Sequence, residues 1–517
     1  MSKFYVTTPI YYVNGEPHIG HAYTSTAADT LARWHRLRGD DTFLLTGTDE
    51  NTLKLVKKAA EEGVAPQQIA DRYAARFEQM TALLNVSNDD FIRTTDEAKH
   101  HPGAQEIWKR LEQGGHIYKG TYEGLYCVDC EAYYTEKDLA DGRCPVHETK
   151  PEKLEEENYF FKLSSFSEPV GKLIASGKYE IIPEPRRNEI LNVIEGGLTD
   201  ISCSRPADKL TMGVPVPGDD SQRMYVWFEA LTNYVNGVGF PKDRQQFEKF
   251  WPADVHVIGK EILRFHAAIW PAMLLAADLP LPKRLYVHGF FNVDGRKMSK
   301  SFGNVVDPFT AAEERGVDAL RYYLLSALPH ASDGDYSEQR FQEVYDSELA
   351  NDLGNLAARV LALVEQKCGG SVPGGGAAAR PQQPKGAASP AAPPPDPTLQ
   401  KLVSETHETF GRLLDGCKFA DALAVLNGLV SAANKFVDTT QPYKQEGAAL
   451  NDSLYTLVQV LGHLSLLYAP VIPASAEKLQ SRLGLKSTGW NPQTLAEWEK
   501  VPSGTTVTKG ESLFPRS

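Results

Sequence analysis

Residues 4–45, FYVTTPIYYVNGEPHIGHAYTSTAADTLARWHRLRGDDTFLL, contain the pattern that decides the fold. The β-branched and aromatic run at residues 4–8 predicts a strand, and residues 42–45 predict a second. Between these two runs, apolar residues recur at helical spacing, at Ala27, Leu31 and Trp34. Strand, helix and strand in this order predict a parallel βαβ unit, in which ligands bind at the carboxyl ends of the strands.

The same alternation returns later in the chain. Residues 255–258 and 285–288 predict strands, and residues 262–277 predict the helix between them. We therefore expect an α/β domain in two halves, 1–116 and 206–336, separated by a cysteine-containing and charged insertion at 117–205.

The last part of the chain, 337–517, has a mostly helical pattern. One apolar stripe of a packed helix comprises Leu454, Leu457, Val458, Leu461 and Leu464. Residues 369–397 are rich in Gly, Ala and Pro and cannot bury a core, so they predict a disordered loop inside an all-α domain.

Composition limits the classes of protein that the chain can belong to. Its 517 residues predict about two to four domains. No apolar run approaches the roughly 18 residues that a membrane helix needs, and the first residues lack a signal-peptide pattern, so we expect a soluble, cytoplasmic protein. The 54 Lys and Arg against 67 Asp and Glu give a net charge of -13. This balance argues against general coating of nucleic acid but permits a local basic face.

The segment Pro17-His18-Ile19-Gly20-His21 follows the first strand and opens the first helix. A helix N-terminus presents N–H groups and partial positive charge, which suit a phosphate. Gly20 allows close approach of a ligand, and two imidazoles can donate hydrogen bonds to a phosphate that gains charge. By itself the segment favours two structural histidines near a helix start, because short motifs match by chance.

A second basic motif, Lys297-Met298-Ser299-Lys300-Ser301, follows the predicted strand at 285–288. Two ammonium groups three residues apart can hold a leaving pyrophosphate, because nucleotidyl transfer depends on positioning and charge neutralisation. A solvated basic loop is the alternative. The occurrence of both motifs in this order, each after a strand, favours phosphate chemistry.

Together the two motifs resemble the HIGH and KMSKS signatures of class I aminoacyl-tRNA synthetases, and nearly the whole chain is similar to the methionyl-tRNA synthetase family. The resemblance implies a Rossmann-type catalytic domain, a zinc-binding connective insertion and a helical-bundle anticodon-binding domain. It also implies an ATP-dependent ligase that forms methionyl-adenylate and transfers methionine to tRNA(Met). Catalytic roles would fall to His18, His21, Lys297 and Lys300. ATP, bound with Mg²⁺, would also contact Tyr12, Gly20 and Ser299.

The methionine pocket is also implied by the resemblance. Asp49 matches the carboxylate that holds the substrate ammonium, and Arg205 matches its supporting partner. The positions that would surround the side chain are Ile10, Tyr12, Trp227, Ala230, Tyr234 and His266. A thioether fits an aromatic slot with its sulfur near ring edges. Without the family, the sequence favours ordinary core aromatics at Trp227 and Tyr234.

Four residues in the insertion have the spacing of a zinc site. Cys127 and Cys130 are followed after 13 residues by Cys144 and His147. Three thiolates and one imidazole suit tetrahedral Zn²⁺, and four protein ligands indicate one structural ion. The alternative, a redox Cys-x-x-Cys pair, lacks a thioredoxin-like context.

The helical region matches the family's anticodon-reading segment. Asn355 and Arg359 are four residues apart and share one helix face, and Tyr443 stands where the family commonly has a base-stacking tryptophan. An aromatic plane and an arginine are what unstacked RNA bases require. A solvated polar face is the alternative.

The chain departs from the family pattern at several positions. Asn51-Thr52 replaces the usual His-Gly after the acidic pair, Glu229 replaces Asp, and Glu261 replaces Asp. These changes keep open a non-catalytic relative that binds tRNA or an amino acid. Synthetases for isoleucine, valine or leucine need a longer editing insertion, and the cysteine enzyme places zinc in its pocket. The sequence shows no C-terminal OB-type extension, so we expect a monomer.

Overall fold

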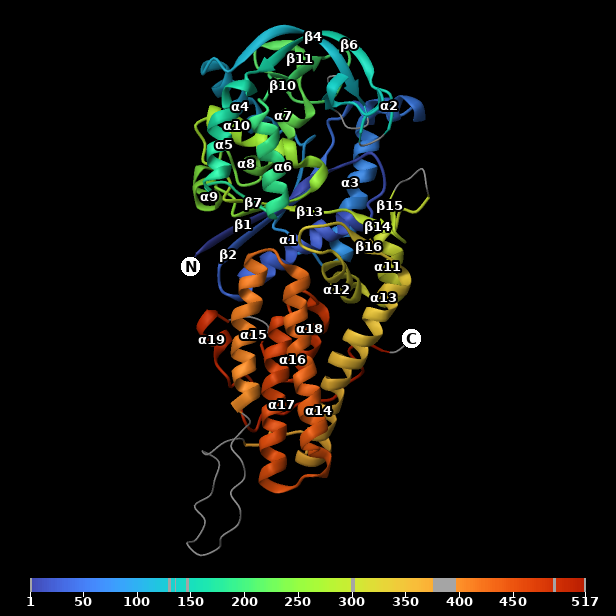
Figure 1. Cartoon of the computed structure of the whole chain (residues 1–517), viewed down its shortest axis with the longest axis vertical. Helices are drawn as coiled ribbons and strands as arrows, with labels where there is room; N and C mark the ends of the chain where they lie inside the picture. The colour runs from blue at the N-terminus through green and yellow to red at the C-terminus, as the bar shows by residue number, and fades with distance from the viewer. Residues whose placement is uncertain are drawn as a thin grey trace, which may run out of the picture. The chain divides into compact units, whose positions relative to one another are not determined.

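The computed structural model describes residues 2–128, 132–134, 136–145, 148–298, 303–374, 397–486 and 490–515 (Figure 1). It divides into two compact units. The sheet unit comprises residues 2–28 and 42–290, and the helical unit comprises residues 29–41 and 291–517. Within the described ranges, no helix is both long enough and apolar enough to cross a bilayer.

A six-stranded sheet forms the centre of the sheet unit, in the order β3-β2-β1-β12-β13-β7. Its strands are β1 (Lys3–Tyr12), β2 (Asp41–Asp49), β3 (Asp90–Arg93), β7 (Glu180–Ile182), β12 (Val255–Gly259) and β13 (Arg284–His288). The pairs β1–β12, β12–β13, β13–β7 and β2–β3 are parallel, with Val6 opposite Val255 and Val257 opposite Tyr286. The α/β fold and the strands predicted at residues 4–8, 42–45, 255–258 and 285–288 are confirmed.

The strand order reverses at β1, because β2 lies on one side of it and β12 on the other. In open parallel sheets, ligands bind at such a switch point, beyond the carboxyl ends of the strands. Strand β1 ends at Tyr12 and β12 ends at Gly259. The segments that follow these two residues are therefore the first places to look for a site.

Helices cover the sheet because their apolar faces need a partner surface. They are α1 (Ile19–Leu37), which continues into the helical unit, α2 (Leu53–Glu62), α3 (Pro66–Leu83), α4 (His101–Gln113), α5 (Ser167–Ala175), α6 (Glu184–Glu195), α7 (Val226–Ala230), α8 (Asn233–Asn236), α9 (Arg244–Phe250) and α10 (Trp270–Ala276). Trp108 on α4 and Trp270 on α10 are fully buried in one continuous core.

The helix predicted at residues 262–277 is present, but its hydrogen-bond pattern is irregular. The structure has a 3₁₀ turn at Lys260–Ile262, a π-helical turn at Phe265–Ile269 and then α10. Pro271 near the start of α10 has no N–H to donate, so the regular hydrogen-bond ladder cannot run through it. A π-helical turn is often associated with a functional site, and this one carries His266.

Two antiparallel sheets complete the sheet unit, and Figure 1 shows their strands β4, β6, β10 and β11 at the top of the view. One contains β5 (Ala132–Tyr134), β4 (Ile117–Cys127), β6 (Glu152–Phe161) and β8 (Ile201–Ser202). The other contains β10 (Pro215–Val216), β11 (Asp219–Met224) and β9 (Ser204–Pro206). Strands β4 and β6 pair along their whole length, from Ile117 opposite Phe161 to Tyr126 opposite Glu152.

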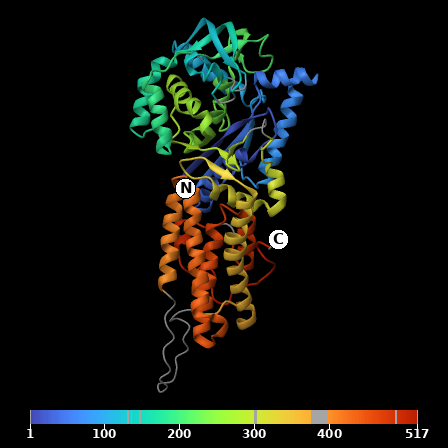
Figure 2. The same ribbon diagram turned by 45° about the vertical axis from the view of Figure 1, so that its right-hand side comes forward.

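The helical unit begins with a small sheet of β15 (Arg296–Lys297), β14 (Phe291–Val293) and β16 (Gly334–Tyr336). Its helices are α11 (Pro308–Arg315), α12 (Val317–Ala327), α13 (Glu338–Val344), a π-helical segment at Tyr345–Gly354, α14 (Asn355–Cys368), α15 (Pro397–Asp415), α16 (Phe419–Thr440), α17 (Gly447–Leu467), α18 (Pro473–Arg482) and α19 (Pro492–Ala496). Figure 2 shows α14 to α17 running side by side as a bundle, which confirms the predicted all-α region.

Helix α17 is the centre of this bundle. Every residue from Ser453 to Leu467 is buried, so the single apolar stripe predicted from Leu454 to Leu464 is extended to all faces of the helix. The reason is that α14, α15, α16 and α18 all pack on it. Most of the predicted loop at 369–397 lies outside the described residues; Val372, near its start, is buried.

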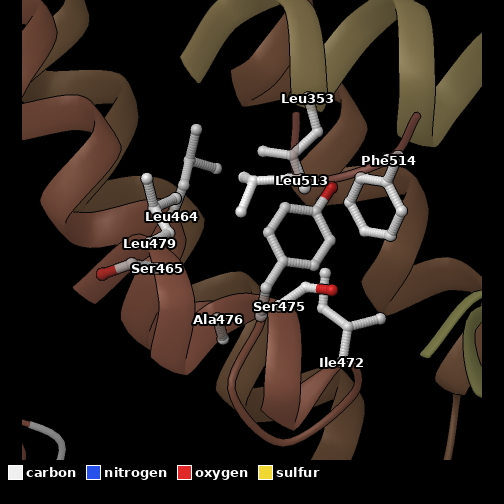
Figure 3. A pocket seen from close by; sticks show the side chains of 10 residues that line it. Leu353, Leu464, Ser465, Ile472, Ser475, Ala476, Leu479, Leu513 and Phe514 are labelled. Atoms are coloured by element: carbon white, nitrogen blue, oxygen red, sulfur yellow. The ribbon is translucent and has the colours of Figure 1, made fainter. Parts of the chain in front are cut away.

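A small cavity lies in the same bundle (Figure 3). Its walls are mainly apolar side chains, including Leu464, Leu479, Leu513 and Phe514. Its volume is about 10 Å³, which is close to the space that one water occupies. A cavity of this size is a packing defect and has no room for a substrate.

Candidate active site

The histidine turn lies directly after β1, at the switch point of the sheet. The backbone N–H of Gly20 donates to His18 Nδ1 at 3.1 Å, and the backbone N–H of His18 donates to His21 Nδ1 at 3.1 Å. The two rings stack with centroids 3.8 Å apart. Because each Nδ1 accepts a hydrogen bond, the neutral tautomers carry their protons on Nε2. Both imidazoles are therefore prepared to donate.

Gly20 permits this arrangement. A Cβ atom at this position would lie 2.9 Å from His18 Cε1, a distance that real contacts essentially never show. His21 is held from the other side by edge-to-face contacts with Tyr11 and Phe77, at 5.0 and 5.1 Å between centroids. The turn is thus built by packing as well as by hydrogen bonds.

Two carboxylates close the neighbouring strand β2. Asp49 is its last residue and is 2% exposed. The fully buried Glu50 accepts hydrogen bonds from Thr48 Oγ1 at 2.6 Å, from Arg93 Nε at 2.7 Å and from Thr95. These donors compensate the charge of Glu50, and the pKa of Arg93 is raised by its bonds to Glu50 against the effect of burial. Glu50 is therefore a fixed structural anion beside Asp49.

An aromatic slot follows the carboxyl ends of β1 and β12. The indole of Trp227 on α7 stacks on Phe265 with centroids 3.8 Å apart and planes at 9°. Tyr12 meets the same indole edge-on at 5.8 Å and 74°. Ile10 on β1 is partly buried against this core, and Ala230 at the end of α7 is buried with its small side chain. Flat rings and small side chains form a wall suited to an unbranched apolar chain.

Tyr234 and His266 form a buried polar pair beside this slot. The ring N–H at Nδ1 of His266 donates to the Ile262 carbonyl at 3.0 Å, so Nε2 accepts from the Tyr234 hydroxyl at 2.7 Å. Burial lowers the pKa of His266 to about 4. Burial, with a contribution from the Asp49 charge, raises the pKa of Tyr234. The pair is neutral over the physiological pH range.

Arg205 on β9 is 3% exposed and lies in an ion pair with Glu156 on β6, at 2.9 Å. Its guanidinium also lies 4.4 Å from the ring centroid of Tyr126. These contacts join the two antiparallel sheets of the sheet unit. A buried guanidinium that is paired and stacked in this way is a rigid positive group.

Lys297 lies in the helical unit, on the exposed strand β15. The side-chain amide of Asn304 donates to its carbonyl at 3.2 Å. Asp294 and Gly295 form the tight turn between β14 and β15 with positive φ angles of 50° and 73°. Ser299 and Lys300 lie outside the described residues. The exposed position of Lys297 leaves its ammonium accessible to an anionic ligand.

Two of the four predicted zinc ligands are described. Cys127 ends β4, Cys144 lies after the 3₁₀ turn Glu136–Asp138, and both are buried. The Sγ atom of Cys127 lies 3.6 Å from Thr149 Oγ1, while the backbone N–H of Cys144 donates to the Thr149 carbonyl at 2.9 Å. Both cysteines therefore converge on one residue. Cys130 and His147 lie outside the described residues, and no metal-binding cluster of three or more ligands occurs among the residues that are described.

The predicted anticodon residues all lie in the helical unit. Asn355 begins α14, and Arg359 one turn later pairs with Asp438 of α16 at 2.9 Å. Tyr443 lies in the 3₁₀ turn Pro442–Lys444 and is 45% exposed, which is unusual for a large aromatic side chain. An exposed ring next to Lys444 can accept a stacked base.

Some residues that shape the site were missed by the sequence analysis. Phe265 lies beneath Trp227, and its position beside His266 was the available signal. His100 and Asn236 form buried hydrogen bonds close to Glu229, with no sequence pattern that indicates them. Contacts of this kind depend on tertiary packing.

Comparison with known proteins agrees with this geometry. The parallel sheet with a histidine turn at its switch point indicates a class I aminoacyl-tRNA synthetase, and residues 4–150 and 134–361 match the family described as tRNA synthetases class I (M). Residues 387–516 match the anticodon binding domain of methionyl tRNA ligase. The chain belongs to the methionyl-tRNA synthetase family.

Individual relatives cover nearly the whole chain. It is 41% identical to a methionine–tRNA ligase of Brucella suis, over 99% of this chain and 98% of that protein. It is 40% identical to the enzyme of Clostridium acetobutylicum, over 99% of this chain and 78% of that protein. The solved structure of Mycobacterium tuberculosis methionyl-tRNA synthetase in complex with methionyl-adenylate is 38% identical, with a TM-score of 0.92 over 100% of both chains.

Proposed function

We propose that the chain activates L-methionine with ATP and then transfers it to the 3′ end of tRNA(Met). The observation that carries the assignment of the amino acid is the aromatic slot of Trp227, Phe265 and Tyr12, with the neutral Tyr234–His266 pair beside it. An apolar, sulfur-containing chain gains contacts with ring edges there, whereas a charged side chain would be desolvated without a partner.

In the first step the methionine carboxylate attacks the α-phosphorus of ATP, and the bond to the β-phosphate oxygen breaks. A carboxylate is already a nucleophile, so the protein has to position the reactants and stabilise charge. The Nε2–H groups of His18 and His21 would donate to the phosphate, and Lys297 and Lys300 would hold the leaving pyrophosphate. Mg²⁺, when bound with ATP, would neutralise part of the phosphate charge.

Asp49 would bind the substrate ammonium, with Arg205 as a supporting cation in the same unit. Tyr12, Gly20 and Ser299 would complete the ATP contacts. In the second step the terminal adenosine hydroxyl of tRNA attacks the activated carbonyl, and AMP leaves. Asn355, Arg359 and Tyr443 would select the tRNA by its anticodon.

The division of labour along the chain forms part of the proposal. Residues 1–116 and 206–336 would form the catalytic domain and 117–205 the connective insertion. Residues 337–517, including the loop at 369–397, would form the anticodon-binding domain. The enzyme would act as a cytoplasmic monomer, and an oligomer seen by light scattering at micromolar concentration would overturn that assignment.

ATP–pyrophosphate exchange, measured separately with each standard amino acid and without tRNA, tests the function. We expect exchange with methionine alone. Strong exchange with another amino acid would support the adenylation reaction but contradict the assignment of the pocket to methionine. No exchange from folded, zinc-loaded protein would instead favour a non-catalytic relative.

One structural zinc ion, held by Cys127, Cys130, Cys144 and His147, is a further part of the proposal. Both described cysteines contact Thr149, Cys127 through its thiol and Cys144 through its backbone N–H, and this proximity supports the proposal. We expect about one equivalent of zinc by elemental analysis, and a loss of most of it in the C127S variant. The C203S variant removes a different buried thiol and should retain the metal. Equal zinc content in both variants would contradict the assignment.

A further inference from the structure

Glu229 on α7 is fully buried between three segments of the sheet unit. Its Oε1 accepts a hydrogen bond from the side-chain amide of Asn51 at 3.0 Å. Its Oε2 is bonded to Nε2 of His100, at the N-cap position of α4, which is also fully buried. These three side chains, the Glu229 cluster, join residues far apart in the sequence.

The donors around the cluster determine its protonation. The side-chain amide of Asn236 donates to the His100 carbonyl at 3.0 Å and lies 3.1 Å from His100 Nδ1, so Nδ1 accepts. The proton of the neutral ring therefore lies on Nε2 and points at Glu229. Burial and the nearby charge of Glu50 raise the pKa of Glu229, whereas the hydrogen bond from Asn51 lowers it; both oxygens face N–H donors, which favour the carboxylate.

The cluster is tightly enclosed. The amide of Asn51 also donates to the Thr94 carbonyl at 3.2 Å, so both of its N–H groups are engaged. Helix α4 packs directly on Asn236, because a Cβ atom at Gly103 would lie 1.7 Å from Asn236 Oδ1. Neither Asn51 nor His100 can move away from Glu229 without leaving a buried polar group unsatisfied, which is costly.

The positions of these residues along the chain relate the cluster to the methionine pocket. Asn51 is two residues after Asp49, the proposed ammonium ligand at the end of β2. Glu229 lies between Trp227 and Ala230 on the five-residue helix α7, which forms a wall of the aromatic slot. The hydrogen bond from Asn51 to Glu229 thus connects the segment that holds the charged end of the substrate to the helix that holds its side chain.

We propose that Glu229, together with Asn51 and His100, positions Asp49 relative to the pocket wall on α7 and thereby sets the affinity for methionine. This role rests on the proposed function. The family pattern has a histidine at the position of Asn51 and an aspartate at the position of Glu229. In this chain the first side chain is therefore shorter than in the pattern, and the second is longer. Since the two departures contact each other, they form a matched pair rather than two independent changes.

The E229Q variant tests the role of the carboxylate without changing its size. Whichever way the new amide is oriented, its NH₂ group faces either the Asn51 amide or the His100 N–H, so one hydrogen bond is lost. We expect the methionine KM in pyrophosphate exchange to rise about tenfold, with the ATP KM within about twofold of wild type.

The N51H and E229D variants and their double variant test the matching. N51H crowds the long Glu229 side chain, and E229D leaves a gap, so each alone should raise the methionine KM about fivefold or more. The double variant exchanges the sizes of the two side chains and should return the methionine KM to within about twofold of wild type. A double variant no better than the worse single would refute the pairing.

The E348Q variant in the helical unit is the matched control. Glu348 likewise accepts from an asparagine amide, that of Asn427 at 2.8 Å, and from the Tyr322 hydroxyl at 2.5 Å. E348Q should lower the melting temperature and leave the methionine KM unchanged. The positioning role is wrong if E229Q behaves in the same way, or raises the methionine and ATP KM values equally. Absence of methionine-dependent exchange in the wild type would overturn the proposed function instead.

Discussion

Replacing Tyr234 with phenylalanine removes one buried oxygen atom and keeps the ring. Tyr234 and His266 are each 1% exposed, and the hydroxyl donates to His266 Nε2 at 2.7 Å. In the Y234F variant this nitrogen is an acceptor without a donor, in a place that water does not reach. A buried polar group left in this state costs about 1–3 kcal/mol.

This cost should be visible in two measurements. It corresponds to roughly 5-fold to 150-fold in an equilibrium constant. Part of it lowers the free energy of unfolding. The rest weakens methionine binding, because the imidazole is no longer held edge-on to Trp227, at 6.2 Å and 83°. We expect the methionine KM in pyrophosphate exchange to rise about tenfold, with the ATP KM within about twofold of wild type.

The Y179F variant is the control, since Tyr179 is also fully buried and its hydroxyl donates to the backbone carbonyl of the same His266, at 2.8 Å. It removes the same atom from the same neighbourhood but leaves the imidazole bonded to Tyr234. We expect a comparable loss of stability with a methionine KM close to wild type. An unchanged methionine KM in Y234F, or equal increases in both variants, would refute the role of the oriented imidazole.

Three further predictions concern other parts of the molecule. The K297A variant should reduce the rate of pyrophosphate exchange roughly 100-fold and leave the melting temperature unchanged, because the side chain is exposed. The control variant R296A should have little effect on the rate. Equal rates in K297A and wild type would show that Lys297 has no role in the reaction. The Y443A variant should raise the KM for tRNA about tenfold and leave tRNA-independent exchange intact; a parallel loss of exchange would point to misfolding. Burial lowers the pKa values of His266 and His288 to about 4, so between about pH 6.5 and 4 the unfolded chain binds more protons than the folded one. The free energy of unfolding should therefore be independent of these two histidines above about pH 6.5, and between about pH 6.5 and 4 it should fall by roughly 1.4 kcal/mol per pH unit for each of them. Urea midpoints that are equal at pH 7 and pH 5 would contradict this.

Much of the fold could be predicted from local patterns. The strands predicted at residues 4–8 and 42–45 are present as β1 and β2, and the helix between them as α1. These elements depend on which residues follow one another, and apolar periodicity reports that directly. The helix predicted at residues 262–277 is present, but apolar periodicity does not show the π-helical turn that precedes Pro271.

The candidate site divides in the same way. The resemblance to the synthetase family implied that Trp227, Tyr234 and His266 share one pocket, and the structure brings these three rings together. In the sequence, the departures from the family pattern at Asn51 and Glu229 are separate changes. In the structure, a hydrogen bond joins these two residues, which are 178 positions apart.

The sequence by itself determined the alternation of strands and helices, the histidine and lysine motifs and the spacing of the cysteines, because each depends on residues close together in the chain. Only the tertiary structure decided that Phe265 stacks under Trp227 and that Glu229 accepts from Asn51 and His100. Such contacts join segments whose separation is set by how sheet and helices pack. A buried carboxylate is stable only where that packing brings donors to both of its oxygens, and no local pattern of residues specifies this.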